Sequence, residues 1–145
     1  MSKGNTYEND LLNLVFKNTD LALIGDATGL RGSTTAGNLY FSLHTADPGE
    51  AGDQTTSEIA YTGYARVAAV RGAGFTVTAN SVSPAATVAF TISSGGAGGT
   101  VTHFGIGTAS SGAGKLLYSG TVTPNIVVSS GVTPQLTTAT AVTED

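Results

Sequence analysis

The stretch NLYFSLH, residues 38–44, alternates two kinds of side chain, and this alternation is typical of a β-strand. The large apolar residues Leu39, Phe41 and Leu43 share one side of an extended chain, because successive side chains of a strand point in opposite directions. The residues between them share the other side: Tyr40, Ser42 and His44. The stretch therefore predicts a half-buried strand whose polar side, with His44, faces outward.

Similar short runs follow this stretch to the end of the chain. They are residues 64–70, 75–78, 87–92, 100–107, 115–122, 126–129 and 132–142, which makes eight predicted strands. Turn-forming residues separate the runs, at 72–74, 93–99, 109–114, 124–125 and 129–131. Strands joined by short turns are antiparallel, so the sequence predicts an all-β fold, an antiparallel β-sandwich with jelly-roll-like topology. The last stretch, 135–143, fits either an edge strand or a tail exchanged with another chain.

Before the strands, the chain predicts one short N-terminal α-helix over about residues 6–17. Asn5 stands three residues before Glu8, which is the spacing of a capping box at a helix N-terminus. An apolar stripe follows it: Tyr7, Leu11, Leu14 and Val15, widened by Leu12 and Phe16. So short a helix is unstable alone, so it docks either on its own sheet or on a neighbouring subunit. We predict two parts, an N-terminal arm (1–37) with this helix and a glycine-rich loop, and a β-sandwich (38–145).

Charged residues make up only 11% of the 145 residues, against roughly a quarter in an ordinary soluble domain. The formal net charge of −4 provides no basic field, so we expect no nucleic acid partner. No apolar run is long enough for a membrane span, and the absence of cysteine excludes disulfides and thiolate metal sites. Such a weakly charged surface suits contact with neighbours, so we expect a homo-oligomer, a dimer or a trimer.

Residues that usually carry chemistry are scarce, and we predict no catalytic, cofactor-binding or metal-binding residue. His44 and His103 are the only histidines, and both are expected at the surface. The acidic loop 47–53 could hold calcium, but a solvated turn around Pro48 and Gly49 explains the same residues, and the acids lack EF-hand spacing. The chain is therefore expected not to be an enzyme and to need no cofactor.

Aromatic and arginine side chains gather around the second predicted strand, and these residue types are enriched at protein interfaces. They could equally lie at the edge of the core with their polar tips in water. We predict an interface made by this group and by the helix: Tyr7, Leu11, Leu14, Tyr61, Tyr64, Arg66 and Arg71.

Three stretches resemble a known family: NLYFSLHTADPGE (38–50), AYTGYARV (60–67) and THFGIG (102–107). They are similar to a family of small virion structural proteins of tailed bacteriophages, whose members are often labelled tail fibre proteins. The chain also resembles the jelly-roll cement proteins of phage capsids. The resemblance implies a protein assembled in the host cytoplasm and located in the virion, and it supplies no site residue.

Two functions are compatible with this resemblance. The first is a capsid decoration or cement protein that binds the major capsid protein and stabilises the shell. The alternative is a tail or tail-fibre component involved in host-surface attachment, through exposed loops such as 46–55 and 93–99. Against a glycan site stands the absence of tryptophan from the chain and of any aromatic residue from either loop.

Overall fold

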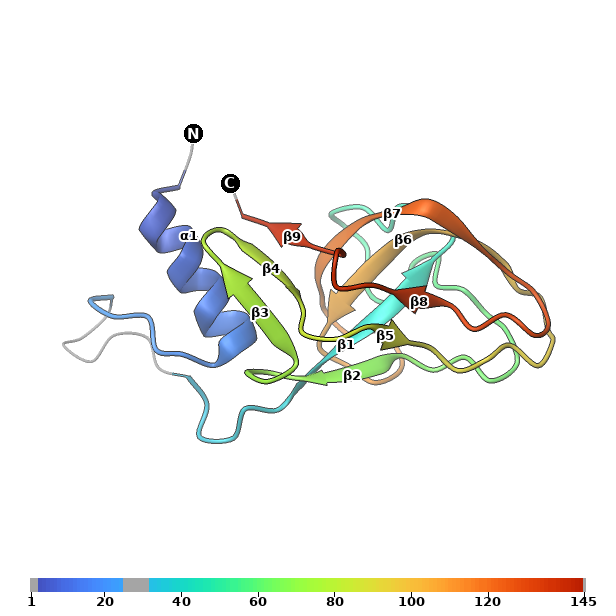
Figure 1. Ribbon diagram of the computed structural model, residues 1–145, viewed down its shortest axis with the longest axis horizontal. Helices are drawn as coiled ribbons and strands as arrows, with labels where there is room; N and C mark the ends of the chain where they lie inside the picture. The colour runs from blue at the N-terminus through green and yellow to red at the C-terminus, as the bar shows by residue number, and fades with distance from the viewer. Residues whose placement is uncertain (1–2, 25–31, 145) are drawn as a thin grey trace. The chain divides into compact units, whose positions relative to one another are not determined.

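The structure is a computed structural model that describes residues 3–24 and 32–144 (Figure 1). Part of the predicted glycine-rich loop, residues 25–31, lies outside the described residues. The helical elements are α1 (Asn5–Leu12) and the π-helical turn η1 (Asn13–Lys17). The strands of the described residues are β1 (Asn38–His44), β2 (Val67–Val70), β3 (Phe75–Thr78), β4 (Ser81–Pro84), β5 (Val88–Ala89), β6 (Gly99–Gly107), β7 (Leu116–Val128), β8 (Gln135–Leu136) and β9 (Val142–Thr143).

The predicted class is confirmed: the chain is all-β and sandwich-like, built from antiparallel sheets with one short N-terminal helix. The sheets have the strand orders β2-β1-β6-β7, β3-β4-β9 and β5-β8. The finer jelly-roll connectivity stays a prediction. No helix of the described residues is long and apolar enough to cross a membrane.

The chain divides into two compact units, which are described separately below. One contains residues 1–38, 69–86 and 138–145, and the other contains 39–68 and 87–137. A compact unit need not fold independently, so the predicted division into an arm and a sandwich stays a prediction.

In the first unit, the helix docks on the β3-β4-β9 sheet of its own chain. Phe16 is fully buried, and its ring meets that of Phe75 edge-on with centroids 5.0 Å apart. Beside them, the Lys17 ammonium donates hydrogen bonds to the backbone carbonyls of Gly72 and Phe75, at 2.9 and 3.0 Å. The question left open by the sequence, whether the helix docks on its own chain or a neighbour, is thereby answered for its buried side.

The face by which the helix docks differs from the predicted stripe. The buried residues are Glu8, Leu12 and Phe16, whereas Tyr7 is 42% exposed and Leu11, Leu14 and Val15 are half-buried. Leu12 and Phe16, which the sequence places at the margin of the apolar stripe, are therefore the centre of the buried face, because the β3-β4 hairpin covers that side of the helix. The predicted capping box is also wrong. Asn5 is already helical, so its side chain is not at the capping position, and Gly4 precedes the helix without a side-chain cap.

In the second unit, β1 lies between β2 and β6 in the four-stranded sheet. All four residues Phe41–His44 of this strand are buried, so both of its faces are covered. The prediction that His44 faces outward is therefore wrong, because a central strand covered on both sides has no solvent face. His103, its partner on β6, is half-buried.

The most visible difference from the predicted strands is in β7, which runs through the predicted turn at 124–125. Its register with β6 shifts from Val101 opposite Ile126 to His103 opposite Thr121, so residues 122–125 form a bulge instead of a turn. The predicted strand 132–142 is two short strands, β8 and β9, in different sheets. Strand β4 was missed, because the sequence SVSP contains a single large apolar residue.

Candidate functional site

The candidate site is built on the loop 45–58, which leaves β1 and returns to the same strand. The backbone amide of Thr45 donates to the carbonyl of Ser57 at 2.8 Å, and that of Ile59 to the carbonyl of Leu43 at 2.9 Å. The loop is therefore closed at its base, in the manner of a compact surface loop whose ends lie together.

Below the loop, His44 is fully buried and both of its ring nitrogens are hydrogen-bonded. Nδ1 lies 2.8 Å from the carbonyl oxygen of Thr56, and Nε2 lies 2.8 Å from the hydroxyl of Ser42. Because a carbonyl can only accept, Nδ1 carries the hydrogen, and Nε2 of the neutral ring accepts from Ser42. Burial lowers the pKa of His44, against the opposing effects of the Thr56 carbonyl and Glu58, so the neutral form is favoured.

Next to His44, Glu58 and Arg66 form a two-pronged ion pair. Arg66 donates from Nε and Nη2 to the two carboxylate oxygens of Glu58, both at 2.7 Å, and Tyr64 donates its hydroxyl to the same carboxylate at 2.7 Å. The third contact of Arg66 is to the carbonyl of Ala109 at 3.0 Å, in the loop between β6 and β7. The bond with Glu58 raises the pKa of Arg66, and burial raises that of Tyr64.

Gln54 joins the loop to the same β6-β7 connection. Its side chain is fully buried, its Oε1 accepts from the amide of Ala109 at 2.9 Å, and its backbone amide donates to Gly114 at 3.1 Å. A Cβ atom at Gly107 or Gly114 would overlap this side chain, so both positions require glycine to admit it. Among the described residues, nothing accepts a hydrogen bond from the buried Nε2 of Gln54. With the ion pair, Gln54 braces the loop from below.

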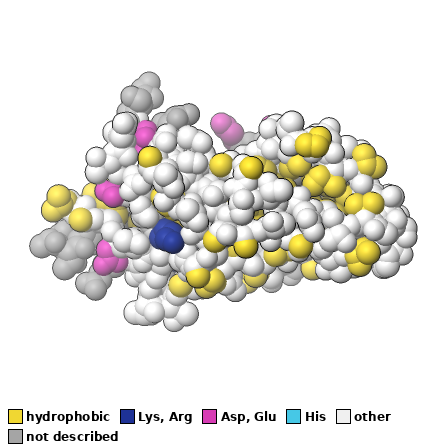
Figure 2. Space-filling model, in the orientation of Figure 1, with side chains coloured by type: hydrophobic (Ala, Val, Ile, Leu, Met, Phe, Trp, Pro, Cys, Tyr) yellow, Lys and Arg dark blue, Asp and Glu magenta, His cyan; other side chains and the backbone are white. Residues whose placement is uncertain are grey.

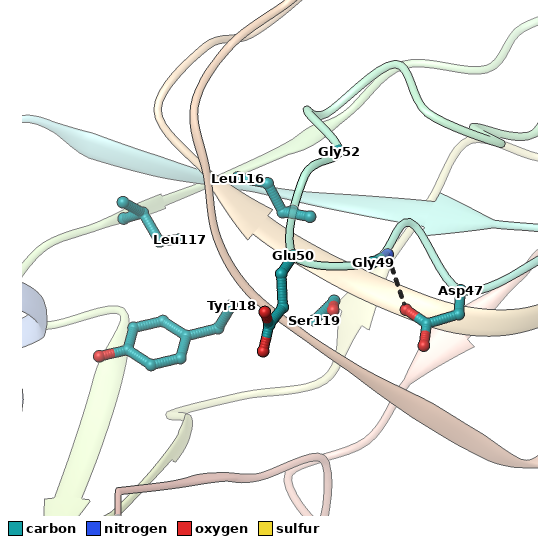
Figure 3. A pocket seen from close by; sticks show the side chains of 8 residues that line it. All are labelled: Asp47, Gly49, Glu50, Gly52, Leu116, Leu117, Tyr118 and Ser119. Atoms are coloured by element: carbon teal, nitrogen blue, oxygen red, sulfur yellow. Dashed lines mark hydrogen bonds between the residues drawn. The ribbon is translucent and has the colours of Figure 1, made fainter.

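The outer part of the loop faces the start of β7 across a hollow of about 460 Å³, shown in Figure 3. The loop contributes Asp47, Gly49, Glu50 and Gly52, and β7 contributes Leu116, Leu117, Tyr118 and Ser119. Asp47 accepts a hydrogen bond from the amide of Gly49 at 2.9 Å, which holds the turn. The exposed Glu50 extends its carboxylate between Tyr118 and Ser119 in this view.

Tyr118 is the residue of this site that sequence reasoning missed. The loop itself contains no aromatic residue, which counted against a glycan site, but the fold brings an aromatic ring to it from a distant strand. The available signal was the β6-β7 hairpin, which places Tyr118 opposite Ile106, and Ile106 pairs in turn with Phe41 in the middle of β1. Sequence distance alone hides this neighbour.

The predicted interface residues lie in both units, and the polar groups of Tyr61, Tyr64, Arg66 and Arg71 contact the chain itself. Tyr61 is buried, donates to the carbonyl of Thr91 at 2.9 Å and packs edge-on against Tyr64. Tyr64 and Arg66 belong to the cluster with Glu58. In the other unit, Arg71 donates to the carbonyls of Leu14 and Val15, both at 2.6 Å. Whether these residues also contact another subunit stays a prediction, as it does for Tyr7 and Leu11.

In the acidic loop Gly49 is exposed but Pro48 is buried, so the solvated turn predicted around these two residues is only partly present. Asp53 accepts from the amide and hydroxyl of Thr55, at 2.7 and 2.6 Å, and these bonds lower the pKa of Asp53. Within residues 3–24 and 32–144, no three His, Cys, Asp or Glu side chains gather in a way that could hold a metal ion. The second loop considered, 93–99, is tied to residues 60–62 by the backbone bonds Thr62 to Gly95 and Gly98 to Ala60.

Charged side chains are sparse on the face of the molecule seen in Figure 2. This exterior, the antiparallel sheets and the comparison with known families together define the class: a structural protein of the bacteriophage particle. The family model that matches is described as Podophage GP4 fiber I protein gp80, and it matches residues 2–143. The chain belongs to this family. No curated protein matches it.

The match confirms the predicted family of phage virion structural proteins and identifies the chain as a virion component. The family is described as a fibre protein, which favours the tail-fibre alternative over capsid decoration.

Proposed function

We propose that the chain is a fibre component of a podophage virion that contributes to attachment of the particle to the host surface. The family description supports the assignment to a fibre. The observation that supports a role in attachment is the loop 45–58, which is exposed at its outer residues and held by hydrogen bonds at its base. A recognition loop works best when it is exposed at its tip and held rigidly at its base, because less conformational entropy is then lost on binding.

This loop meets both conditions. Its outer residues Asp47, Gly49 and Glu50 are exposed, whereas Gln54 and His44 beneath it are fully buried. Its base is fixed by backbone bonds and by the Glu58–Arg66 pair, whose arginine side chain is 2% exposed. The weakly charged exterior suits a protein whose remaining surface is covered by neighbouring subunits. A contact with the major capsid protein and a dimer or trimer remain proposals of lower rank.

The test uses the purified full chain and cells of a strain that the phage infects. We expect the chain to bind these cells, to slow phage adsorption when added in excess, and to bind resistant cells less. Its copy number in purified virions, measured by quantitative mass spectrometry, should be that of a tail structure. Absence of cell binding together with hundreds of copies per virion would contradict the proposal and favour capsid decoration.

A further inference from the structure

The hollow between the loop and β7 combines three kinds of group that together suit one class of ligand. It offers carboxylates from Asp47 and Glu50, an aromatic ring from Tyr118, and exposed backbone at Gly49. Its volume of about 460 Å³ lies within the range of roughly 300–1,000 Å³ that is typical of small-molecule sites.

The carboxylates provide acceptors for hydroxyl groups. Glu50 is exposed and extends into the hollow, and a carboxylate can accept hydrogen bonds from two adjacent hydroxyls, with the added strength of its charge. Asp47 uses one oxygen on Gly49, and its other oxygen adds acceptor capacity. A ligand with neighbouring hydroxyl groups fits this arrangement.

The tyrosine provides a flat surface beside those acceptors. Tyr118 is half-buried on β7 and lines the hollow together with Leu116 and Leu117. Aromatic side chains present an apolar face together with a polar tip, which suits a ligand with both C–H and O–H surfaces. A pyranose ring has both surfaces.

The negative charge of the residues that line the hollow distinguishes neutral sugars from acidic ones. Among the described residues that line the hollow, two are acidic and none is basic, and the chain as a whole carries a net charge of −4. An acidic sugar would meet like charge on entry, which disfavours its binding.

We propose that this hollow binds a neutral hexose unit of a host-surface polysaccharide, with Glu50 accepting from its hydroxyls and Tyr118 packing against its ring. The inference rests on the proposed attachment function and specifies its ligand.

The test is a titration of the full, isotope-labelled chain followed by amide NMR. The probes are methyl α-D-glucopyranoside, methyl β-D-galactopyranoside and N-acetyl-D-glucosamine, with D-glucuronate as the acidic sugar and calcium chloride as the cation. We expect at least one neutral sugar to shift the amides of residues 47–52 and 116–119 in a saturable way, and glucuronate and calcium not to do so. Absence of any such shift, or equal shifts with glucuronate or with calcium alone, would overturn the inference.

Matched variants locate the binding. Glu50→Gln should weaken sugar affinity by about tenfold, the effect of losing one charge-assisted hydrogen bond. Asp10→Asn, which removes the same charge from helix α1, should leave it unchanged. Tyr118→Ala should abolish binding, and Tyr118→Phe should restore most of it. Should Tyr118→Ala fail to fold, Glu50→Gln on the exposed loop still decides the outcome, because equal affinity in that variant counts against the hollow.

The two proposals fail differently. If the unaltered chain binds host cells but Glu50→Gln and Tyr118→Ala bind them equally well, the sugar site is wrong and attachment stands. If the unaltered chain binds no cells, the attachment function is wrong, whatever the sugar titration shows.

Discussion

The helix of the first unit and the loop 45–58 of the second are both short segments that need support, and they obtain it by different means. The helix is held mainly by apolar burial of Leu12 and Phe16, and its last turn is held by hydrogen bonds between Lys17 or Arg71 and backbone carbonyls. The loop is held by polar side chains, chiefly the half-buried Glu58 and the buried Arg66. Apolar packing tolerates small shifts, whereas an ion pair with two parallel hydrogen bonds fixes both distance and angle. The loop that we propose for recognition is thus the segment whose support depends more strictly on distance and angle.

The largest effect expected from this comparison comes from the loop. Glu58→Ala leaves the guanidinium of Arg66 buried without its carboxylate, and removing one partner of a buried pair costs about 3–5 kcal/mol. We expect a corresponding drop in the free energy of unfolding measured with denaturant, with faster amide exchange in residues 45–58. The double variant Glu58→Leu with Arg66→Met should recover much of the loss. A cost below about 1 kcal/mol would mean that the pair behaves as an exposed one.

Leu12→Ala tests the apolar support of the helix. Removing a fully buried leucine side chain should cost about 2–5 kcal/mol, because transfer energy is lost and a cavity remains. We expect faster amide exchange in residues 5–17, with the loop 45–58 unchanged. Leu11→Ala, at a half-buried neighbouring position, is the control and should cost clearly less. If Leu11→Ala costs as much as Leu12→Ala, the helix docks by the apolar stripe that the sequence predicts.

Gly107→Ala sharpens the comparison by disturbing the loop without touching a charge. A methyl group at this position overlaps the buried side chain of Gln54, so we expect a loss of about 1–3 kcal/mol from overpacking. The expected readout is a lower melting temperature together with altered amide shifts in the loop. Gly112→Ala, where a methyl group would meet nothing within 4 Å but the backbone φ is +72°, controls for the turn itself. Unchanged loop shifts in Gly107→Ala would show that Gln54 does not brace the loop.

The smallest effect concerns pH. Because burial lowers the pKa of His44 in the folded chain, the unfolded chain binds more protons between that pKa and the ordinary value near 6.5. The stability contributed by His44 is therefore present above about pH 6.5 and is lost as the pH falls toward the folded pKa. The charged and titratable groups around it are Glu58, Arg66 and His103.

We expect unfolding free energies measured between about pH 5 and pH 8 to decline on the acidic side, and the decline to be weaker in His44→Asn. The control is Lys17→Met in the helix, which should lower stability without changing the slope. If the unfolding free energy of His44→Asn declines equally steeply, titratable groups other than His44 cause the pH dependence.

The sequence predicted the elements well where a single face of a segment is buried. The run 75–78 matches β3 residue by residue, and the helix occupies nearly the predicted residues. The prediction failed where contacts with segments distant in the sequence determine whether a residue is buried or where a strand ends. Alternation of side chains predicts a solvent-exposed face that includes His44, yet residues Phe41–His44 are all buried and the His44 ring is hydrogen-bonded to the carbonyl of Thr56 in the following loop. Pro124 and Asn125 are turn residues by type, but pairing with β6 continues on both sides of them.

The same distinction holds for the candidate site. The loop 46–55 was considered for attachment from its exposed, turn-forming residues, and the structure describes just such a loop over nearly the same residues. Its supports could not be predicted, because Ala109 and Gly114 lie more than fifty residues away in sequence and their contacts with Gln54 depend on the register of β6 and β7. Tyr118 was invisible for the same reason.

The bulge in β7 has a consequence for solubility. This strand is the last of its sheet, and residues 116–128 contain no charged side chain, so a regular strand here would offer a long template for aggregation. Residues 122–125 interrupt the template, and Pro124 lacks the amide that a further strand would need. The edge of this sheet is thus a poor template for pairing with the same edge of a second copy.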